Sequence, residues 1–126
     1  MDKIYPIKFT VSATPSLNKL HSNRWQMVNA KKKYLKELRG YEVYRLKEKK
    51  KMKLIYERHG SRFLDQENWF GSTKVLTDAI KEMGLIVDDR QEWLDIQHLP
   101  QVKCKRGEEK TEVCLLESMA EGLKDS

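Results

Sequence analysis

The sequence predicts an α/β (α+β) fold, because segments with strand and helix periodicity alternate along the chain. Residues 4–11 and 52–59 carry apolar side chains at every second position, the period of a half-buried strand. Residues 25–47 instead place apolar side chains at three- and four-residue steps, as one face of a helix does. At 126 residues the chain is long enough for one domain, residues 1–126, with a modest core.

Composition points to an anionic partner. Charged residues make up 35% of the chain and the net charge is +6, so nucleic acid is the first class of partner to consider. The alternative is a basic protein with no such partner. The sequence has no apolar run long enough for a membrane span and no signal-peptide pattern at its start. We therefore expect no membrane association, a cytoplasmic location, and free thiols at Cys104 and Cys114.

The first half of the chain combines a helix with a strongly basic surface. Residues 12–18 are loop-like, and Gly40 weakens the middle of the predicted helix, so two helices or a kink are expected there. The basic run at residues 47–53 is either a solvated helix end or a phosphate-contacting surface. The candidate DNA-contacting residues are Lys31, Lys32, Lys33, Lys49, Lys50 and Lys51.

In the second half a short helix is predicted over residues 73–83, ended by Gly84. Residues 92–104 and 109–117 follow as two strands, joined by a turn at 105–108 across which the two cysteines could face each other. Pro100 favours an edge position or an irregularity in the first of them. The polar tail, residues 118–126, is expected to fray. Trp69 and Phe70 are interpreted as core anchors, with stacking on bases or sugars as the alternative.

Carboxylates flank the predicted short helix on both sides. Asp65 and Glu67 precede it, and in an extended segment they would point the same way. Asp88 and Asp89 follow it, and Lys74 opens it near the positive end of the helix dipole. Hard oxygen ligands from separate segments, with a cation close by, are what a divalent-metal phosphodiester site needs.

Simpler explanations exist for each of these residues. Two adjacent aspartates often mark a turn, and Lys74 could pair only with Asp78, four residues away. His21, His59 and His98 are isolated in the sequence and fit surface or hydrogen-bonded histidines better than catalysts. Neither a glycine-rich phosphate loop nor a catalytic-triad arrangement is present.

The order of motifs adds specificity that single motifs lack. The relevant segments are Pro15-Ser16-Leu17-Asn18, Asp65-x-Glu67-Asn68, Lys74, Asp78-Ala79-Ile80 and Gly84-x-x-x-Asp88-Asp89. This order resembles the RusA family of Holliday-junction resolvases, which carries P-S-x-N, D-x-D-N, a nearby lysine, D-A-[LI] and G-x-x-x-D-D. The resemblance is best over residues 52–117. Many members come from phages or prophages, so it suggests a bacterial or phage-infected host cell as the setting.

The resemblance implies a RusA-like homodimer with a small mixed sheet packed with helices, which nicks four-way DNA junctions symmetrically. It assigns Asp65, Glu67, Lys74 and Asp89 as catalytic, with Mg²⁺, or Mn²⁺ in its place, on the three acids and Asp88 as a further candidate ligand. Two departures from the family pattern are Glu67 in place of aspartate and a longer gap before Lys74. A non-catalytic DNA-binding protein and a basic protein-interaction module are the competing interpretations.

Overall fold

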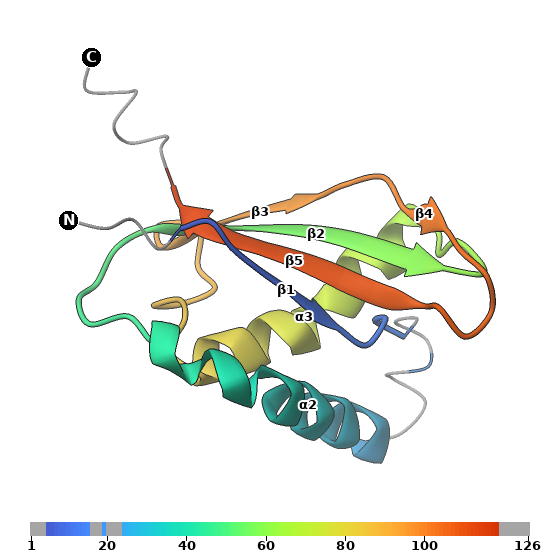
Figure 1. Cartoon of the computed structure of the whole chain (residues 1–126), viewed down its shortest axis with the longest axis horizontal. Helices are drawn as coiled ribbons and strands as arrows, with labels where there is room; N and C mark the ends of the chain where they lie inside the picture. Colours follow the sequence, from blue (N-terminus) through green and yellow to red (C-terminus); the bar gives the residue numbers. More distant parts are fainter. Residues whose placement is uncertain (1–4, 16–18, 20–23, 119–126) are drawn as a thin grey trace.

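The computed structural model describes residues 5–15, 19 and 24–118, and these form a five-stranded sheet with helices packed on one side (Figure 1). The mixed α and β composition predicted from the sequence is confirmed. The elements in chain order are β1 (Ile7–Val11), α2 (Arg24–Leu38), the short 3-10 helix η1 (Arg39–Tyr44), β2 (Met52–Gly60), α3 (Gln66–Glu82), β3 (Leu94–His98), β4 (Val102–Lys103) and β5 (Lys110–Glu117).

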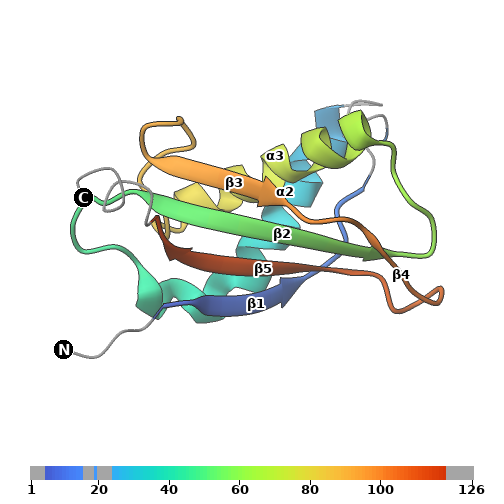
Figure 2. The ribbon, with the colours of Figure 1, turned by 90° about the horizontal axis from the view of Figure 1, so that it is seen from above.

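The sheet is mixed, and β2 lies at its centre. Its order is β1-β5-β2-β3, and the short strand β4 pairs with the last residues of β2 (Figure 2). β5 is antiparallel to both β1 and β2, whereas β3 and β4 run parallel to β2. Because parallel neighbours need a long crossover, α3 and the loop after it connect β2 to β3.

The core lies between the sheet and the helices, as the period-two pattern predicts. Met52, Leu54 and Tyr56 of β2 are fully buried, and the residues between them are only partly covered. α3 contributes Leu76, Ala79 and Ile80 to the same core, all fully buried. Tyr56 also donates or accepts a 2.7 Å hydrogen bond with the Thr77 hydroxyl, so its polar end is satisfied inside the core.

The first helix ends earlier than the predicted residue 47. α2 stops at Leu38 and continues as η1 to Tyr44, which matches the weakening expected at Gly40. Lys31 of α2 forms ion pairs with Asp78 at 3.0 Å and Glu82 at 2.8 Å, and these pairs join α2 to α3. Asp78 is therefore paired with Lys31, and the alternative explanation of Lys74 as only a partner of Asp78 is wrong.

The second helix begins earlier than predicted. α3 starts at Gln66, not residue 73, because Asp65 is a helix N-cap whose Oδ1 accepts from the Asn68 backbone N–H at 2.8 Å. Gly71 and Ser72, which precede the predicted start, and Thr73 are buried residues of this helix. The Ser72 and Thr73 hydroxyls donate to the carbonyls of Trp69 and Phe70, three residues earlier, at 2.8 and 3.0 Å. This local bonding lets small polar residues lie inside the helix.

The predicted hairpin between residues 92–104 and 109–117 is wrong. β5 lies between β1 and β2, while β4 pairs with the opposite edge of β2. The turn itself is present, with Gly107 at a φ of 96°, and Pro100 separates β3 from β4 as an irregularity. Cys104 and Cys114 are free thiols, as expected, but do not face each other across a hairpin. Residues 16–18, His21 and the tail from residue 119 lie outside the described residues.

Candidate functional site

A cavity of about 740 Å³ opens at the β3 edge of the sheet, where α3 passes beside the strand. It combines groups from three segments: helix α3, the loop that follows it, and β3. Its lining residues are Phe70, Thr73, Lys74, Thr77, Asp89, Ile96, Gln97 and His98. Two of the four residues assigned as catalytic, Lys74 and Asp89, thus border one cavity.

Lys74 lies in the middle of α3, not at its start. The helix-dipole argument made from the sequence therefore fails, because that effect is confined to the first turn. The residues on either side of Lys74, Thr73 and Val75, are buried, while Lys74 itself is exposed. The helix thus fixes the base of the lysine and leaves its long stem to reach along the cavity wall.

The loop after α3 positions Asp89. Gly84, at a φ of 80°, ends the helix in the left-handed conformation that the sequence predicts, and buried Leu85 and Ile86 then anchor the chain. Asp88 accepts from Lys81 at 3.1 Å and from Arg90 at 2.9 Å, and its Oδ1 also accepts from the Asp89 N–H at 2.7 Å.

These donors hold the pKa of the Asp88 carboxyl well below its usual range, with the Lys81 hydrogen bond as the largest cause. The Asp88 carboxylate therefore stabilises the loop after α3 through these contacts. Asp89 is the member of the pair that borders the cavity.

The interpretation of His98 as a hydrogen-bonded histidine is confirmed, but the sequence does not place it in the cavity wall. Its ring lies among aromatic groups, 4.5 Å from the Phe70 ring centroid and 4.9 Å from that of Trp69. Its Nε2 lies 2.8 Å from the Thr73 hydroxyl, and because that hydroxyl donates to the Phe70 carbonyl, Nε2–H is assigned as the donor to Thr73.

Burial lowers the pKa of the His98 imidazole, so the neutral form is favoured. The signal that locates this histidine is the parallel register that places it opposite Tyr56, and register is not readable from the sequence.

The structure does not gather the predicted acidic residues into one group. Asp65 uses both carboxylate oxygens at the helix N-terminus, the second accepting from the Asn68 side chain at 3.0 Å. Glu67 lies in the first turn of α3, on the same face as Lys74 but two turns away, about 10 Å along the axis. The expectation that Asp65 and Glu67 project together from an extended segment is wrong.

Among the described residues, a single trio of histidine, cysteine or acidic side chains has ligand atoms close enough together to hold a metal ion. This trio comprises Glu57, His59 and Glu112. It contains none of the predicted acids.

The six lysines assigned to DNA contact fall into two groups. Lys31, Lys50 and Lys51 form ion pairs, the latter two with Glu117 at 2.8 Å and Asp95 at 3.6 Å. The side chains of Lys32, Lys33 and Lys49 are exposed to solvent. A role in DNA contact stays a prediction for all six, with the second group better placed to reach a phosphate.

Comparison of the sequence with protein-family models and with curated protein sequences gives no match. The RusA resemblance therefore remains a hypothesis based on motif order. In the part of the chain that the structure describes, no helix has the length and apolar character needed to cross a membrane.

Chemically, the cavity suits a ligand with an anionic group beside a ring. Lys74 offers a cation and Asp89 a carboxylate, and the neutral His98 ring supports Phe70. Phe70 and Ile96 are 43% and 42% exposed, whereas Trp69 is 3% exposed and belongs to the core. Trp69 is thus confirmed as a core anchor. The interpretation of Phe70 as a core anchor is wrong, because its ring keeps an exposed aromatic surface.

Proposed function

We propose that this protein is a metal-dependent endodeoxyribonuclease that resolves branched DNA by paired nicks, with its chemistry in the cavity between α3 and β3. The observation that carries the proposal is that Lys74 and Asp89, assigned from two separate motifs, border the same cavity. Glu67 supports it from the same face of α3. A phosphodiester offers the matching chemistry: an anionic phosphate for Lys74, and a sugar or base for Phe70.

The side chains around the cavity fit Mg²⁺ better than a softer metal. Mg²⁺ usually keeps several waters and binds through one or two carboxylates together with substrate phosphates, so a cage of three acids is not required. Asp89 would hold it, with water and a substrate phosphate as its other ligands. When bound, such an ion supplies an activated water and stabilises charge on the phosphate oxygens.

The chain's own groups have separate tasks in this proposal. Lys74 attracts the phosphate and neutralises charge on it, a role suited to a compact ammonium. Phe70, backed by the His98 ring, packs against a sugar or base next to the cleaved bond. Asp65 only positions the other groups, because its carboxylate caps α3, the helix that carries Lys74 and Phe70.

Paired nicks imply two equivalent sites, so we propose that the active form is a homodimer. Sedimentation of the protein at micromolar concentration, alone and with a synthetic four-way junction, measures this directly. We expect a dimer in at least the DNA-bound sample. A monomer under both conditions would contradict the paired-nick mechanism while leaving single-strand cleavage possible.

The decisive experiment is cleavage of a synthetic four-way junction with Mg²⁺ or Mn²⁺ by wild type and Asp89→Asn. We expect Asp89→Asn to abolish cleavage and to bind the junction as well as or better than wild type, because a carboxylate repels phosphate when no metal is bound. Asp78→Asn is the matched control, since Asp78 is an exposed acid on α3 that pairs with Lys31. Equal cleavage by wild type and Asp89→Asn would remove the cavity from the mechanism.

A second candidate is a DNA-binding protein without catalysis. The observation that favours it is the engagement of Asp65 in capping and Asp88 in ion pairs, which leaves fewer acids for a metal. On this account wild type binds the junction with strong salt dependence and cuts nothing with either metal. Absence of binding as well would favour the protein-interaction module.

A further inference from the structure

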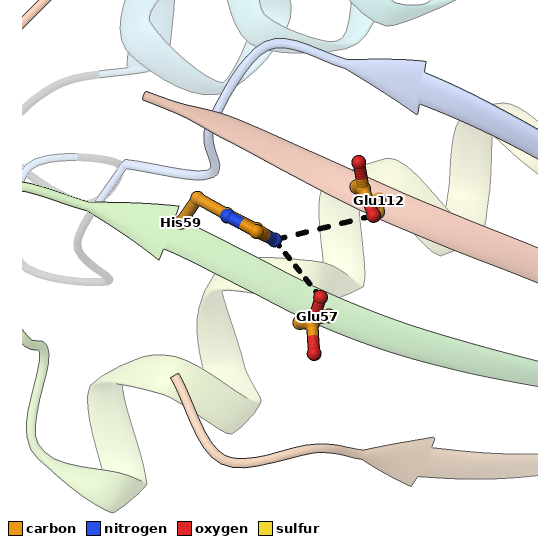
Figure 3. Close-up of side chains that lie close together, drawn as sticks. All are labelled: Glu57, His59 and Glu112. Carbon is orange, nitrogen blue, oxygen red and sulfur yellow. Dashed lines mark hydrogen bonds and ion pairs between the residues drawn. The ribbon is translucent and has the colours of Figure 1, made fainter. Parts of the chain in front are cut away.

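We propose that Glu57, His59 and Glu112 form a binding site for a divalent transition-metal ion of the zinc class on the uncovered face of the sheet (Figure 3). This site is separate from the cavity beside α3. Helices α2 and α3 both pack on the other face of the sheet (Figure 1). The cavity is lined by α3, whereas Glu57, His59 and Glu112 alternate with the buried positions of β2 and β5, so the two sites lie on opposite faces.

The pairing of the strands builds this trio. Glu57 of β2 lies directly opposite Glu112 of β5 in the antiparallel register, and such neighbours have closely spaced side chains. His59 lies two residues along β2 and so projects from the same face as Glu57. Since β2 and β5 both have a partner strand on each side, the backbone that carries all three ligands is held rigidly.

The distances suit one ion after small side-chain movements. His59 Nε2 lies 2.9 Å from Glu57 Oε1 and 4.0 Å from Glu112 Oε1, and the three ligand atoms lie within 4.8 Å of one another. Zinc bonds of about 2.0–2.2 Å at a tetrahedral angle separate neighbouring ligands by roughly 3.4 Å. The shorter contact must lengthen and the longer contact must shorten, each by about half an ångström, which rotation of the glutamates provides.

The donor set selects the class of metal. An imidazole nitrogen suits zinc and its transition-metal neighbours, whereas Mg²⁺ prefers oxygen alone. Three protein ligands leave one tetrahedral position open. Glu57 and Glu112 also border a hollow of about 560 Å³ on this face, together with Ile55 and Cys114, so the open position has room for water or a further ligand.

The competing explanation is a network of ion pairs with no metal. Lys110 Nζ lies 3.1 Å from Glu112 Oε2, so one oxygen of Glu112 already has a cationic partner. The other oxygen, Oε1, is the one directed toward His59. Lys110 and a metal can therefore share Glu112, one on each oxygen.

Calorimetric titration of metal-free protein with Zn²⁺ tests the site, and Co²⁺ serves as a coloured substitute whose spectrum reports the ligand geometry. We expect saturable binding of one ion per chain, and no competition from an equal concentration of Mg²⁺. His59→Ala and Glu112→Gln should each weaken Zn²⁺ binding at least about tenfold. Loss of a group that only hydrogen-bonds to a metal ligand already lowers metal affinity by about that factor. The circular dichroism of the metal-free variants should match that of wild type.

Two control variants separate the site from other causes of zinc binding. Glu117→Gln removes an exposed acid of β5 that pairs with Lys50, and Cys114→Ser removes a thiol that borders the same hollow as Glu57 and Glu112. Both should bind Zn²⁺ as wild type does. Absence of saturable binding to wild type would leave the ion-pair network as the correct account. Binding that survives in both His59→Ala and Glu112→Gln, or that disappears in Cys114→Ser, would also overturn the proposal.

Discussion

The two faces of the sheet differ in how they bring chemical groups together. On the helix-covered face, alternate strand residues are buried and apolar, and polar side chains there have internal partners, as Ser72 has in Thr14 at 2.8 Å. The cavity described above opens at the β3 edge of this face. On the uncovered face, charged residues lie in the middle of the sheet, as Glu57 and Glu112 do.

This difference shows that the two sites depend on different structural features. The cavity needs a helix, a loop and a strand to be packed correctly, because Lys74 and Asp89 come from separate segments. The trio on the uncovered face needs only the pairing of β2 with β5. A change in helix packing should therefore alter the cavity and leave the trio intact.

Two adjacent leucines on β5 allow the packing of the two faces to be compared. Replacing the buried leucine gives the largest expected effect, a loss of stability. Leu115 is fully buried under the helices, while Leu116 projects from the uncovered face and is partly exposed. Leu115→Ala should lower the free energy of unfolding by about 3 kcal/mol. Leu116→Ala should lower it by about 1 kcal/mol or less. Urea denaturation of both variants is the measurement, and similar losses would mean that the uncovered face is buried, as in a dimer that uses it.

Lys74 carries the next largest expected effect. Lys74→Ala should lower single-turnover cleavage of a four-way junction about a hundredfold or more, because one charge-stabilising donor is lost. Lys74→Arg should restore only part of the rate, since a planar guanidinium is not a compact charge. Asp78→Ala, which breaks a pair with Lys31 and not with Lys74, should cut nearly as fast as wild type. Cleavage by Lys74→Ala at the wild-type rate would make Lys74 a surface residue only.

Much of the fold is readable from the sequence because local periodicity records it. The alternation over residues 52–59 predicts β2 within one residue of its observed end, Gly60, and Gly84 marks the end of α3. The start of α3 is misread because Gly71, Ser72 and Thr73 resemble a turn. In the structure their small size and hydroxyl-to-carbonyl bonds make them buried helix, and Asp65 supplies the cap eight residues upstream of the predicted start at residue 73.

The sites are less readable because they depend on contacts between distant segments. The sequence identifies Lys74 and Asp89 as candidates, and both border the cavity. It does not show that His98 lines the cavity or that Glu57, His59 and Glu112 lie together, since strand register decides what lies opposite each of them. A one-residue slip in register would move a side chain to the other face of the sheet, and the spacing within one strand does not record that choice.

The lysines of α2 provide a smaller effect that separates DNA contact from helix packing. Log affinity for junction DNA should fall linearly with log salt concentration. In Lys33→Ala the magnitude of this slope should be smaller by about one, because one phosphate contact is lost. Lys31→Ala should leave that slope nearly unchanged, since its ammonium is paired with Asp78 and Glu82. Its cost should instead be about 0.5 kcal/mol of stability. Filter binding over a series of salt concentrations measures the slopes, and equal slopes for the two variants would remove this distinction.

The last expected effect is the pH dependence that His98 contributes to stability. Burial lowers the pKa of the folded imidazole below its ordinary value of 6.5, so between these two values the unfolded chain binds more protons than the folded one. Wild type should therefore lose stability as the pH falls below about 6.5, by at most about 1.4 kcal/mol per pH unit from this one group. His98→Gln removes the titrating ring and keeps a hydrogen-bonding group near Thr73. Its free energy of unfolding should fall less than that of wild type over the same pH interval.

Denaturation midpoints of wild type and His98→Gln between pH 7 and pH 5 measure the difference. Asp88 does not interfere in this window. Its pKa is lowered in the folded state, so its stabilising contribution is present above the ordinary carboxyl pKa and is lost only at more acidic pH. Parallel curves for the two proteins from pH 7 to pH 5 would mean that His98 takes up its proton equally in both states. The cavity wall at β3 would then be open to water, in contrast to the close packing of His98 against Trp69 and Phe70.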